Sequence, residues 1–390
     1  MKAILKAGHL LTIVEKGMAS IAVPPKSVVT MAEFGKLAFE DDKIGIRTSH
    51  ENASSYCIQS IEDGETIEDE GACVVSMPRL RSMLKILSPD SEVSVLLKPP
   101  VSGEDGFGNV FFKSGKSKWK MPTIHEDTIV DPRRKKGKVI FSAPKPDIAK
   151  AFKAVSFAGN VKDANFIQSN VCISVHDNEL FFGATDEVRC AAFKISVDES
   201  LELNRILIPI AAYSPILRTF DKGDIEVCSG DGHVSFCQEQ HVVKISLPTE
   251  SDVNNFPNFE ALIAGQHPVR IEVMASRLKD IVSACNQMNQ EECLMRIADG
   301  ELEFFAYDII DGMAYHSSLN HTGDSVKIDM GLCPVYIVDF LSKVTEDTVF
   351  IEFPIASGKP KHIKLVDDGG HYFIMKALVD LIHLPPQVNE

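Results

Sequence analysis

The tripeptide Gly115-Lys116-Ser117 has the residue types that end a phosphate-binding loop, in which backbone amides and a lysine hold nucleotide phosphates. That loop also requires a glycine five residues earlier and a helix directly afterwards. Val110 stands at the glycine position, and residues 118–121 alternate polar and apolar side chains, which is typical of a strand. We therefore predict a β-hairpin over 109–121 that turns at Ser114-Gly115, and no nucleotide site.

The same hairpin contains four lysines and the only tryptophan of the chain. Lysines that alternate with apolar residues most simply lie on a solvated face of the hairpin. Trp119 and Met121 share the opposite face, so they belong either to a hydrophobic core or to an interface.

Catalysis would need a constellation of reactive residues elsewhere in the chain. Asp186 and Arg189, or the twelve histidines, could be proposed as catalytic groups, but the sequence lacks G-x-S-x-G, H-E-x-x-H and zinc-ligand spacings. The nine cysteines are scattered, odd in number and never spaced C-x-x-C, which indicates a reducing compartment without a disulfide framework. We therefore expect no enzyme, no metal and no cofactor.

The chain has 390 residues, of which 44% are hydrophobic and 24% charged. This composition is typical of a globular protein, and the length allows two to four domains. Residues 206–217 form the longest nearly apolar run, which is too short to cross a bilayer, so we expect no membrane association. The formal net charge of −15 argues against a simple nucleic-acid binder unless the positive charge is concentrated on one surface.

The elements that carry these residues recur three times along the chain. One pattern has a strand, an acidic turn, a second strand, a polar break and a third strand. It occurs at 37–61, 173–197 and 295–319, with turns at Asp41-Asp42, Asp177-Asn178 and Asp299-Gly300. A second pattern, a strand end, a proline and an amphipathic helix, occurs at 74–87, 205–220 and 331–344, with Pro78, Pro209 and Pro334. A closing hairpin occurs at 108–123, 232–249 and 361–378.

Each copy also begins with an amphipathic helix, most clearly at 145–156 and 276–285, where apolar residues recur at i, i+3, i+4 and i+7. The prediction is an α+β fold of three similar domains, each with two helices on antiparallel sheets. The expected domains are residues 1–138, 139–264 and 265–390, and the basic run 132–138 is most simply a solvated linker.

Four segments in register resemble the bacterial-type sliding clamp, the β subunit of DNA polymerase III. They are "KSGKSKWKMPTI" (113–124), "LFFGATDEVRCAAFKI" (180–195), "FPNFEALI" (256–263) and "YFIM" (372–375). The resemblance covers the whole chain in order. The chain is longer and more divergent than typical members, as a phage-encoded version could be.

The resemblance implies a processivity factor: a head-to-tail homodimeric ring around duplex DNA, with helices lining the hole. Its partners would be the DNA, read without sequence specificity, a replicative polymerase and an ATP-dependent clamp loader, in a bacterial or infected-host cytoplasm. The expected DNA-binding residues are Lys26, Arg81, Lys85, Lys150, Lys153, Arg218, Arg277, Lys279 and Lys343. A lysine of this group taken alone is more simply part of a solvated helix face, so the prediction applies to the group and not to any one member.

The resemblance also implies a hydrophobic cleft between the second and third domains, where client peptides dock. Its expected residues are Thr185, Arg189, Cys190, Phe373, Ile374, Met375 and Leu378, although strand packing is an equal alternative for Phe373 and Met375. Here the chain departs from the family: Glu187-Val188 replaces Gly-His, Ala264 stands at a cleft proline, and the chain continues past the usual end.

Trp119 and Met121 match residues of the family's dimer interface, with a place in the core as the alternative. A competing interpretation of the whole chain is a structural or scaffolding protein made of repeated β-rich domains. Such a protein would share the triplication but would not need basic helices.

Overall fold

The structure is a computed structural model. It describes residues 1–20, 33–49, 53–98, 108–124, 129, 137–160, 167–176, 179–196, 203, 205–308 and 310–378. Its elements recur three times in the order strand, helix, several strands, helix, strands, which confirms the predicted triplication and the α+β class.

The first copy contains β1 (Lys2–Lys6), α1 (Ala7–Gly17), β2 (Phe34–Glu40), β3 (Lys43–Ser49), β4 (Ala53–Ser60), β5 (Thr66–Asp69), β6 (Gly71–Ser76), α2 (Met77–Lys85), β7 (Glu92–Lys98), β8 (Asn109–Ser114) and β9 (Ser117–Pro122). The second contains β10 (Lys138–Pro144), α3 (Lys145–Val155), the 3-10 helix η4 (Ser156–Ala158), β11 (Asn170–His176), β12 (Glu179–Thr185), β13 (Arg189–Ser196), β14 (Ile206–Pro209), the 3-10 helix η5 (Ile210–Ala212), α4 (Tyr213–Thr219), β15 (Asp224–Gly230), β16 (His233–Gln238) and β17 (His241–Ser246).

Two short helices, α5 (Glu250–Asn255) and α6 (Phe259–Ala264), lead to the third copy. It contains β18 (Val269–Met274), α7 (Ala275–Met288), β19 (Cys293–Ala298), β20 (Glu301–Asp308), β21 (Met313–Asn320), β22 (Thr322–Gly323), β23 (Lys327–Leu332), α8 (Pro334–Leu341), β24 (Thr348–Phe353), β25 (Ser357–Gly358), β26 (His362–Val366) and β27 (His371–Lys376).

Contacts group the chain into two compact units, which divide the middle copy between them. The first unit contains residues 1–148 and 211–249, and the second contains residues 149–210 and 250–390. The predicted boundaries at 138/139 and 264/265 follow the sequence repeat instead, so the three domains stay a prediction.

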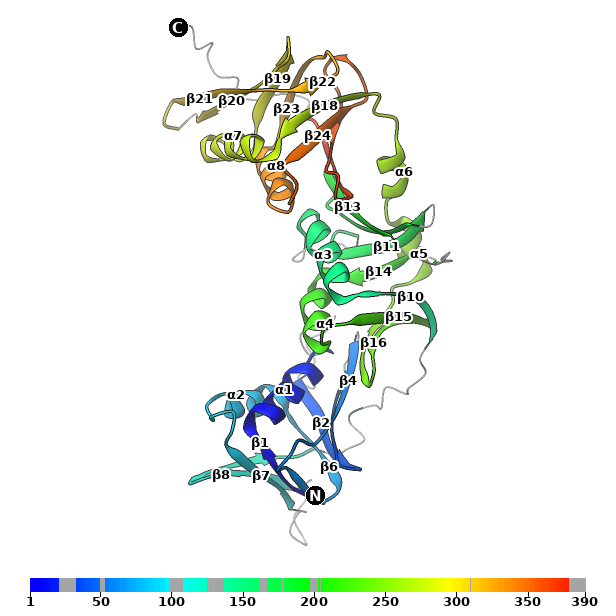
Figure 1. Cartoon of the computed structure of the whole chain (residues 1–390), viewed down its shortest axis with the longest axis vertical. Coiled ribbons are helices and arrows are strands. Elements are labelled where there is room, and N and C mark those ends of the chain that lie inside the picture. The colour runs from blue at the N-terminus through cyan, green and yellow to red at the C-terminus, as the bar shows by residue number, and fades with distance from the viewer. Residues whose placement is uncertain are drawn as a thin grey trace. The chain divides into compact units, whose positions relative to one another are not determined.

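The first unit contains two sheets, with strand orders β5-β1-β7-β8-β9 and β10-β15-β16-β17-β4-β3-β2-β6. The second sheet crosses from one copy to the next where β17 pairs antiparallel with β4, so that Val242 lies opposite Tyr56. Helix α1 contacts both α2 and α4 (Figure 1). Its apolar stripe of Leu10, Ile13 and Val14 is fully buried, as the helical spacing predicts.

The second unit also contains two sheets, with strand orders β14-β11-β12-β13-β27-β26-β24-β18-β22 and β21-β20-β19-β23-β25. Here β13 pairs antiparallel with β27, which again joins two copies in one sheet. Helices α7 and α8 lie side by side (Figure 1). The predicted apolar positions of α7, at Leu278, Ile281, Val282 and Cys285, are buried.

Turn geometry agrees with the acidic turns of the sequence. Asp41 and Asp42 both have positive φ, and so do Asp299 and Gly300, as two-residue turns of a twisted hairpin require. The third expected turn, 177–178, lies outside the described residues. The hairpin predicted over 109–121 is confirmed as β8 and β9, with Gly115 at a φ of +55° in its turn.

The prolines behave differently in the three copies. Pro78 and Pro334 stand in the first turns of α2 and α8, where a missing N–H is tolerated. Pro209 instead ends β14, and η5 separates it from α4. The prediction of a strand end followed by proline and helix is therefore confirmed in full for two copies, with an added 3-10 turn in the other.

All nine cysteines are free thiols, and eight of them are buried. Across the described helices, none is long and apolar enough to span a membrane.

Candidate functional site

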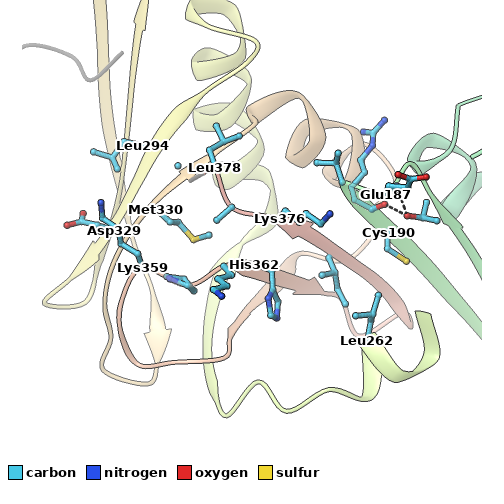
Figure 2. A pocket seen from close by; sticks show the side chains of 18 of the residues that line it. Glu187, Cys190, Leu262, Leu294, Asp329, Met330, Lys359, His362, Lys376 and Leu378 are labelled. Atoms are coloured by element: carbon cyan, nitrogen blue, oxygen red, sulfur yellow. Dashed lines mark hydrogen bonds between the residues drawn. The ribbon is translucent and has the colours of Figure 1, made fainter. Parts of the chain in front are cut away.

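The second unit contains a cleft of about 1210 Å³ (Figure 2). Five of the seven residues predicted for a docking cleft line it: Thr185, Arg189, Cys190, Ile374 and Leu378. They come from the end of β12, the start of β13, β27 and the segment after it. The cleft therefore forms where the backbone pairing of β13 with β27 brings the second and third copies together.

A tight turn between β12 and β13 forms one end of this cleft. The Thr185 hydroxyl donates a hydrogen bond to the Arg189 carbonyl at 2.7 Å and accepts one from the Glu187 amide at 3.1 Å. Asp186 Oδ1 accepts from the amides of Val188 and Arg189 at 3.2 and 2.9 Å. Glu187 has a φ of +73°, a left-handed conformation that favours glycine.

The side chain of Arg189 is held on several sides. Its Nε donates to Asp186 Oδ2 at 2.9 Å, and its Nη1 donates to Asp339 Oδ2 at 2.7 Å. Its guanidinium also lies 4.3 Å from the centre of the Tyr336 ring, at a distance typical of a cation–π contact. Arg189 is thus a positioning residue that fixes the turn against α8.

The floor of the cleft is apolar. Cys190 lies opposite Ile374 in the β13–β27 pair, and Leu262 of α6 is 46% exposed beside them. Burial raises the pKa of the Cys190 thiol to about 12, so it is neutral and behaves as a small apolar group. Leu294 and Met330 line the other end of the cleft. Such a surface is suited to apolar side chains, and its thiol is not ionised at neutral pH.

Two of the predicted cleft residues, Phe373 and Met375, do not line it. They are 0% and 1% exposed, because alternate residues of β27 face opposite sides of the sheet. The Phe373 ring stacks on Phe340 of α8 with 5.3 Å between centroids. The structure therefore corrects the prediction to core packing for these two residues.

Lysines on one rim of the cleft were missed by the sequence analysis. Lys359 and Lys361 precede β26 and Lys376 ends β27, and all three are exposed. The Ala377 amide donates to the Lys361 carbonyl at 2.8 Å, and Lys376 lies opposite His362 in the strand pair. Lys359 and Lys361 are close in the sequence, but only the register of β26 with β27 brings Lys376 to them.

The helices of the three copies carry most of the predicted DNA-binding residues. Helices α1, α2, α3, α4, α7 and α8 have ten lysines and arginines against four acidic residues, whereas the whole chain has 40 against 55. Lys150, Lys153, Arg218, Arg277 and Lys279 are exposed on them. Positive charge is therefore concentrated on the helices.

Some predicted basic residues are engaged within the chain. Arg81 and Lys85 pair with Glu15 at 2.7 and 3.4 Å. Partial burial acts to raise the pKa of Glu15, but hydrogen bonds from these two cations outweigh it and lower the pKa below its ordinary value. Lys343 lies just beyond the end of α8, and Lys26 lies outside the described residues.

Trp119 and Met121 lie on β9, an edge strand of its sheet as described. Both are half-buried and pack against the core of the first unit. The lysines between and beside them, Lys118 and Lys120, are exposed. This edge is therefore apolar on one face and basic on the other.

Among the described residues, no three histidine, cysteine, aspartate or glutamate side chains gather as a metal site would require. Comparison of the sequence with protein-family models and with curated proteins finds no match.

Solved structures do match. The DNA polymerase III subunit beta of Pseudomonas aeruginosa aligns with 97% of this chain and all of its own, at 14% identity and a TM-score of 0.81. The DNA polymerase III beta subunit structure from Eubacterium rectale covers 97% and 100% at 17% identity and a TM-score of 0.82. The beta sliding clamp of Caulobacter crescentus covers 97% and 98% at 11% identity and a TM-score of 0.83.

The chain has the sliding-clamp fold. The match extends over all three copies of the repeat, in agreement with the fold expected from the sequence resemblance. At identities of 11–17% the match shows the fold alone.

Proposed function

We propose that this chain is a sliding clamp, a non-catalytic processivity factor that encircles duplex DNA and tethers a replicative polymerase. The observation that carries the proposal is a complete sliding-clamp fold whose helices are basic although the chain as a whole is acidic. Contacts between such helices and phosphates carry no sequence information, so they hold the duplex and still permit sliding. A scaffolding protein of the same fold would not need this charge distribution.

The proposed ring is a head-to-tail homodimer of three-domain chains, with domains at 1–138, 139–264 and 265–390. Its interface would join β9 of one copy to β21 of the other, because both are edge strands of their sheets as described. Charge supports this pairing. Lys118 and Lys120 lie on β9, whereas Glu301 and Glu303 lie on β20, the neighbour of β21.

The DNA-contacting groups would be the exposed helix residues Lys150, Lys153, Arg218, Arg277 and Lys279, together with Arg81 and Lys85 of α2 and with Lys343 after α8. Lys26, outside the described residues, would join them. Opening and closing the ring on closed DNA would require an ATP-dependent clamp loader. These partners place the protein in the cytoplasm of a bacterium or of an infected host.

The proposed client site is the cleft of the second unit, which would hold an apolar peptide of the polymerase. One of the matched Pseudomonas aeruginosa structures is a sliding clamp bound to griselimycin, and the Caulobacter crescentus structure has PEG at a beta-motif tethering region. An apolar floor with Leu262 half-exposed suits a peptide anchor in this chain.

The decisive experiment is retention on circular against linear DNA. Clamp loaded on nicked circles should persist at a salt concentration that removes it from short linear duplex, and it should be lost when the circle is cut. Direct binding to linear duplex should be weak, with a Kd of roughly 10⁻⁶ M or higher. Equal salt sensitivity on the two substrates would mean ordinary electrostatic binding and would refute the ring.

A further inference from the structure

The rim of the cleft carries positive charge that the chain itself does not neutralise. Lys359, Lys361 and Lys376 are exposed and all line the cleft. Within the described part of the chain, none of the three forms an ion pair or a side-chain hydrogen bond. The two arginines of the lining already pair with carboxylates. Arg189 pairs with Asp186 and Asp339, and Arg296 Nε donates a hydrogen bond to Asp329 at 2.9 Å.

The lysines form one group because of the strand register. The β26–β27 pair places Lys376 opposite His362, and the Ala377 amide bonds the Lys361 carbonyl. Figure 2 shows Lys376 between the Leu378 end of the cleft and the Glu187 end, with Lys359 further along. Partial burial and the neighbouring His267 lower the pKa of His362, so this imidazole adds no charge at neutral pH. Three like charges around one apolar floor repel one another until an anionic ligand arrives.

We propose that the cleft selects an acidic client: a peptide segment with an apolar anchor for the floor and carboxylates beside it for Lys359, Lys361 and Lys376. This inference rests on the proposed clamp function and specifies the chemistry of its partner. The anchor provides affinity by burying apolar area, and the carboxylates provide the choice of partner and a faster encounter.

A nucleic acid strand is the other polyanion that the lysines could hold, but the floor does not suit it. Single-stranded nucleic acids are held by aromatic platforms on which the bases stack. The described lining contains aliphatic and sulfur-containing side chains, such as Leu262, Leu294 and Met330, and its only aromatic ring is the imidazole of His362. The geometry therefore favours a peptide.

The test uses fluorescence anisotropy with the full chain and two labelled probes, Glu-Glu-Glu-Glu-Leu-Leu-Phe and its Gln-for-Glu counterpart. The acidic probe should bind roughly tenfold more tightly at low salt, and the difference should shrink in high salt. The triple variant Lys359→Gln, Lys361→Gln, Lys376→Gln should lose this preference. A matched triple variant at lysines of the first unit that do not line the cleft, Lys43→Gln, Lys138→Gln and Lys222→Gln, should keep it.

Charge reversal makes the test stricter. The variant Lys359→Glu, Lys361→Glu, Lys376→Glu should reject the acidic probe and prefer one with four lysines before the same anchor. Equal binding of the acidic and Gln probes to the parent chain would overturn the proposal. So would an oligonucleotide that displaces the acidic probe, or a marked gain in probe binding on removal of residues 379–390, which would make the chain's own end the occupant.

The failure of this inference can be separated from failure of the clamp proposal. Each variant is also tested for salt-resistant retention on circular DNA, which the rim lysines should not affect. Retention with no acidic preference would refute the acidic client alone, whereas loss of retention in the parent chain would refute the clamp.

Discussion

Arg189 of β13 donates a hydrogen bond to Asp339 of α8 at 2.7 Å, and through this contact the helix holds the turn at one end of the cleft. The guanidinium is largely buried, with 11% of its side chain exposed, and it also pairs with Asp186. It is therefore committed to the fold and is not available to a bound partner.

Replacing Arg189 by Met should lower the free energy of unfolding by about 2–4 kcal/mol, because Asp186 and Asp339 then lose their shared cation in a partly buried place. Urea denaturation measures the change. The milder variant Asp339→Asn should cost under about 1 kcal/mol, since that carboxylate is 40% exposed and an amide oxygen can still accept the bond. Equal losses in the two variants would contradict the assigned role of Arg189.

Glu187 tests the conformation of the same turn. Holding a non-glycine residue such as Glu187 in the left-handed conformation destabilises the folded state by about 1 kcal/mol. Glycine avoids this strain, but it loses more backbone entropy on folding than glutamate does, which costs about the same free energy. Glu187→Gly should therefore leave the free energy of unfolding within about 0.5 kcal/mol of the parent. Glu187→Val should lower it by about 1–2 kcal/mol, because a branched side chain resists this φ. Thermal unfolding of the two variants compares them, and a neutral valine would show that the turn has another conformation.

His371 should make the protein sensitive to acid. Burial, with smaller contributions from Lys150 and Lys343, lowers its pKa to about 3. The unfolded chain therefore binds the proton more readily than the folded one, and stability falls as the pH drops from about 6.5 towards 3, by roughly 1.4 kcal/mol per pH unit.

The measurement is the difference in unfolding free energy between the parent and His371→Gln at several pH values, in which the carboxylates common to both chains cancel. The parent should lose about 3 kcal/mol relative to the variant between pH 6.5 and pH 4. A constant difference across that range would show that His371 does not titrate as its burial requires.

The proposed ring can be opened at β9. Lys118→Glu with Lys120→Glu should yield a folded monomer, because it places negative charge on an edge expected to meet β21 and its acidic neighbour β20. Sedimentation velocity reports the mass, which should fall from twice 42.9 kDa to 42.9 kDa. These exposed lysines are safer targets than half-buried Trp119 and Met121, whose replacement also disturbs the core. A dimer that persists would place the interface elsewhere.

Basic helices should matter for loading and not for assembly. Lys153→Glu, Arg218→Glu and Lys279→Glu together should impair loading on circular DNA severalfold while the dimer stays intact, since phosphate contacts are individually weak but additive. The matched control changes Lys43, Lys138 and Lys327 to Glu, which makes the same change in charge on strands instead of helices. If the control impairs loading equally, net charge and not the helix surface is responsible.

Much of the fold follows from local patterns in the sequence. Acidic turns and helical stripes reveal the threefold repeat, because the types that tolerate a left-handed turn are few and the spacing of buried residues in α3 and α7 is regular. The pairings that join the copies, β4 with β17 and β13 with β27, do not follow, because distant strands leave no mark on each other's sequence.

The site was predictable only in part for the same reason. Tyr372 to Met375 are apolar in succession, so no alternation shows which of them face the cleft and which the core. Lys359 and Lys361 lie in one loop and Lys376 at a distant strand end, and only the folded register makes Lys376 their neighbour. The resemblance of "LFFGATDEVRCAAFKI" (180–195) to the family did point to Thr185, Arg189 and Cys190, and all three line the cleft.

The cross-copy pairing has a consequence for synthesis on the ribosome. Strand β4, which carries Tyr56, has an open edge until β17, which carries Val242, has emerged from the ribosome. At about 5–20 residues per second that interval lasts on the order of ten seconds or more. Strand β13 has an open edge for the same length of time before β27 is synthesised, because Arg189 and its partner Met375 are as far apart in the sequence as Tyr56 and Val242. An open edge is a template for wrong pairing between chains, so the nascent protein should depend on chaperones until each late strand arrives.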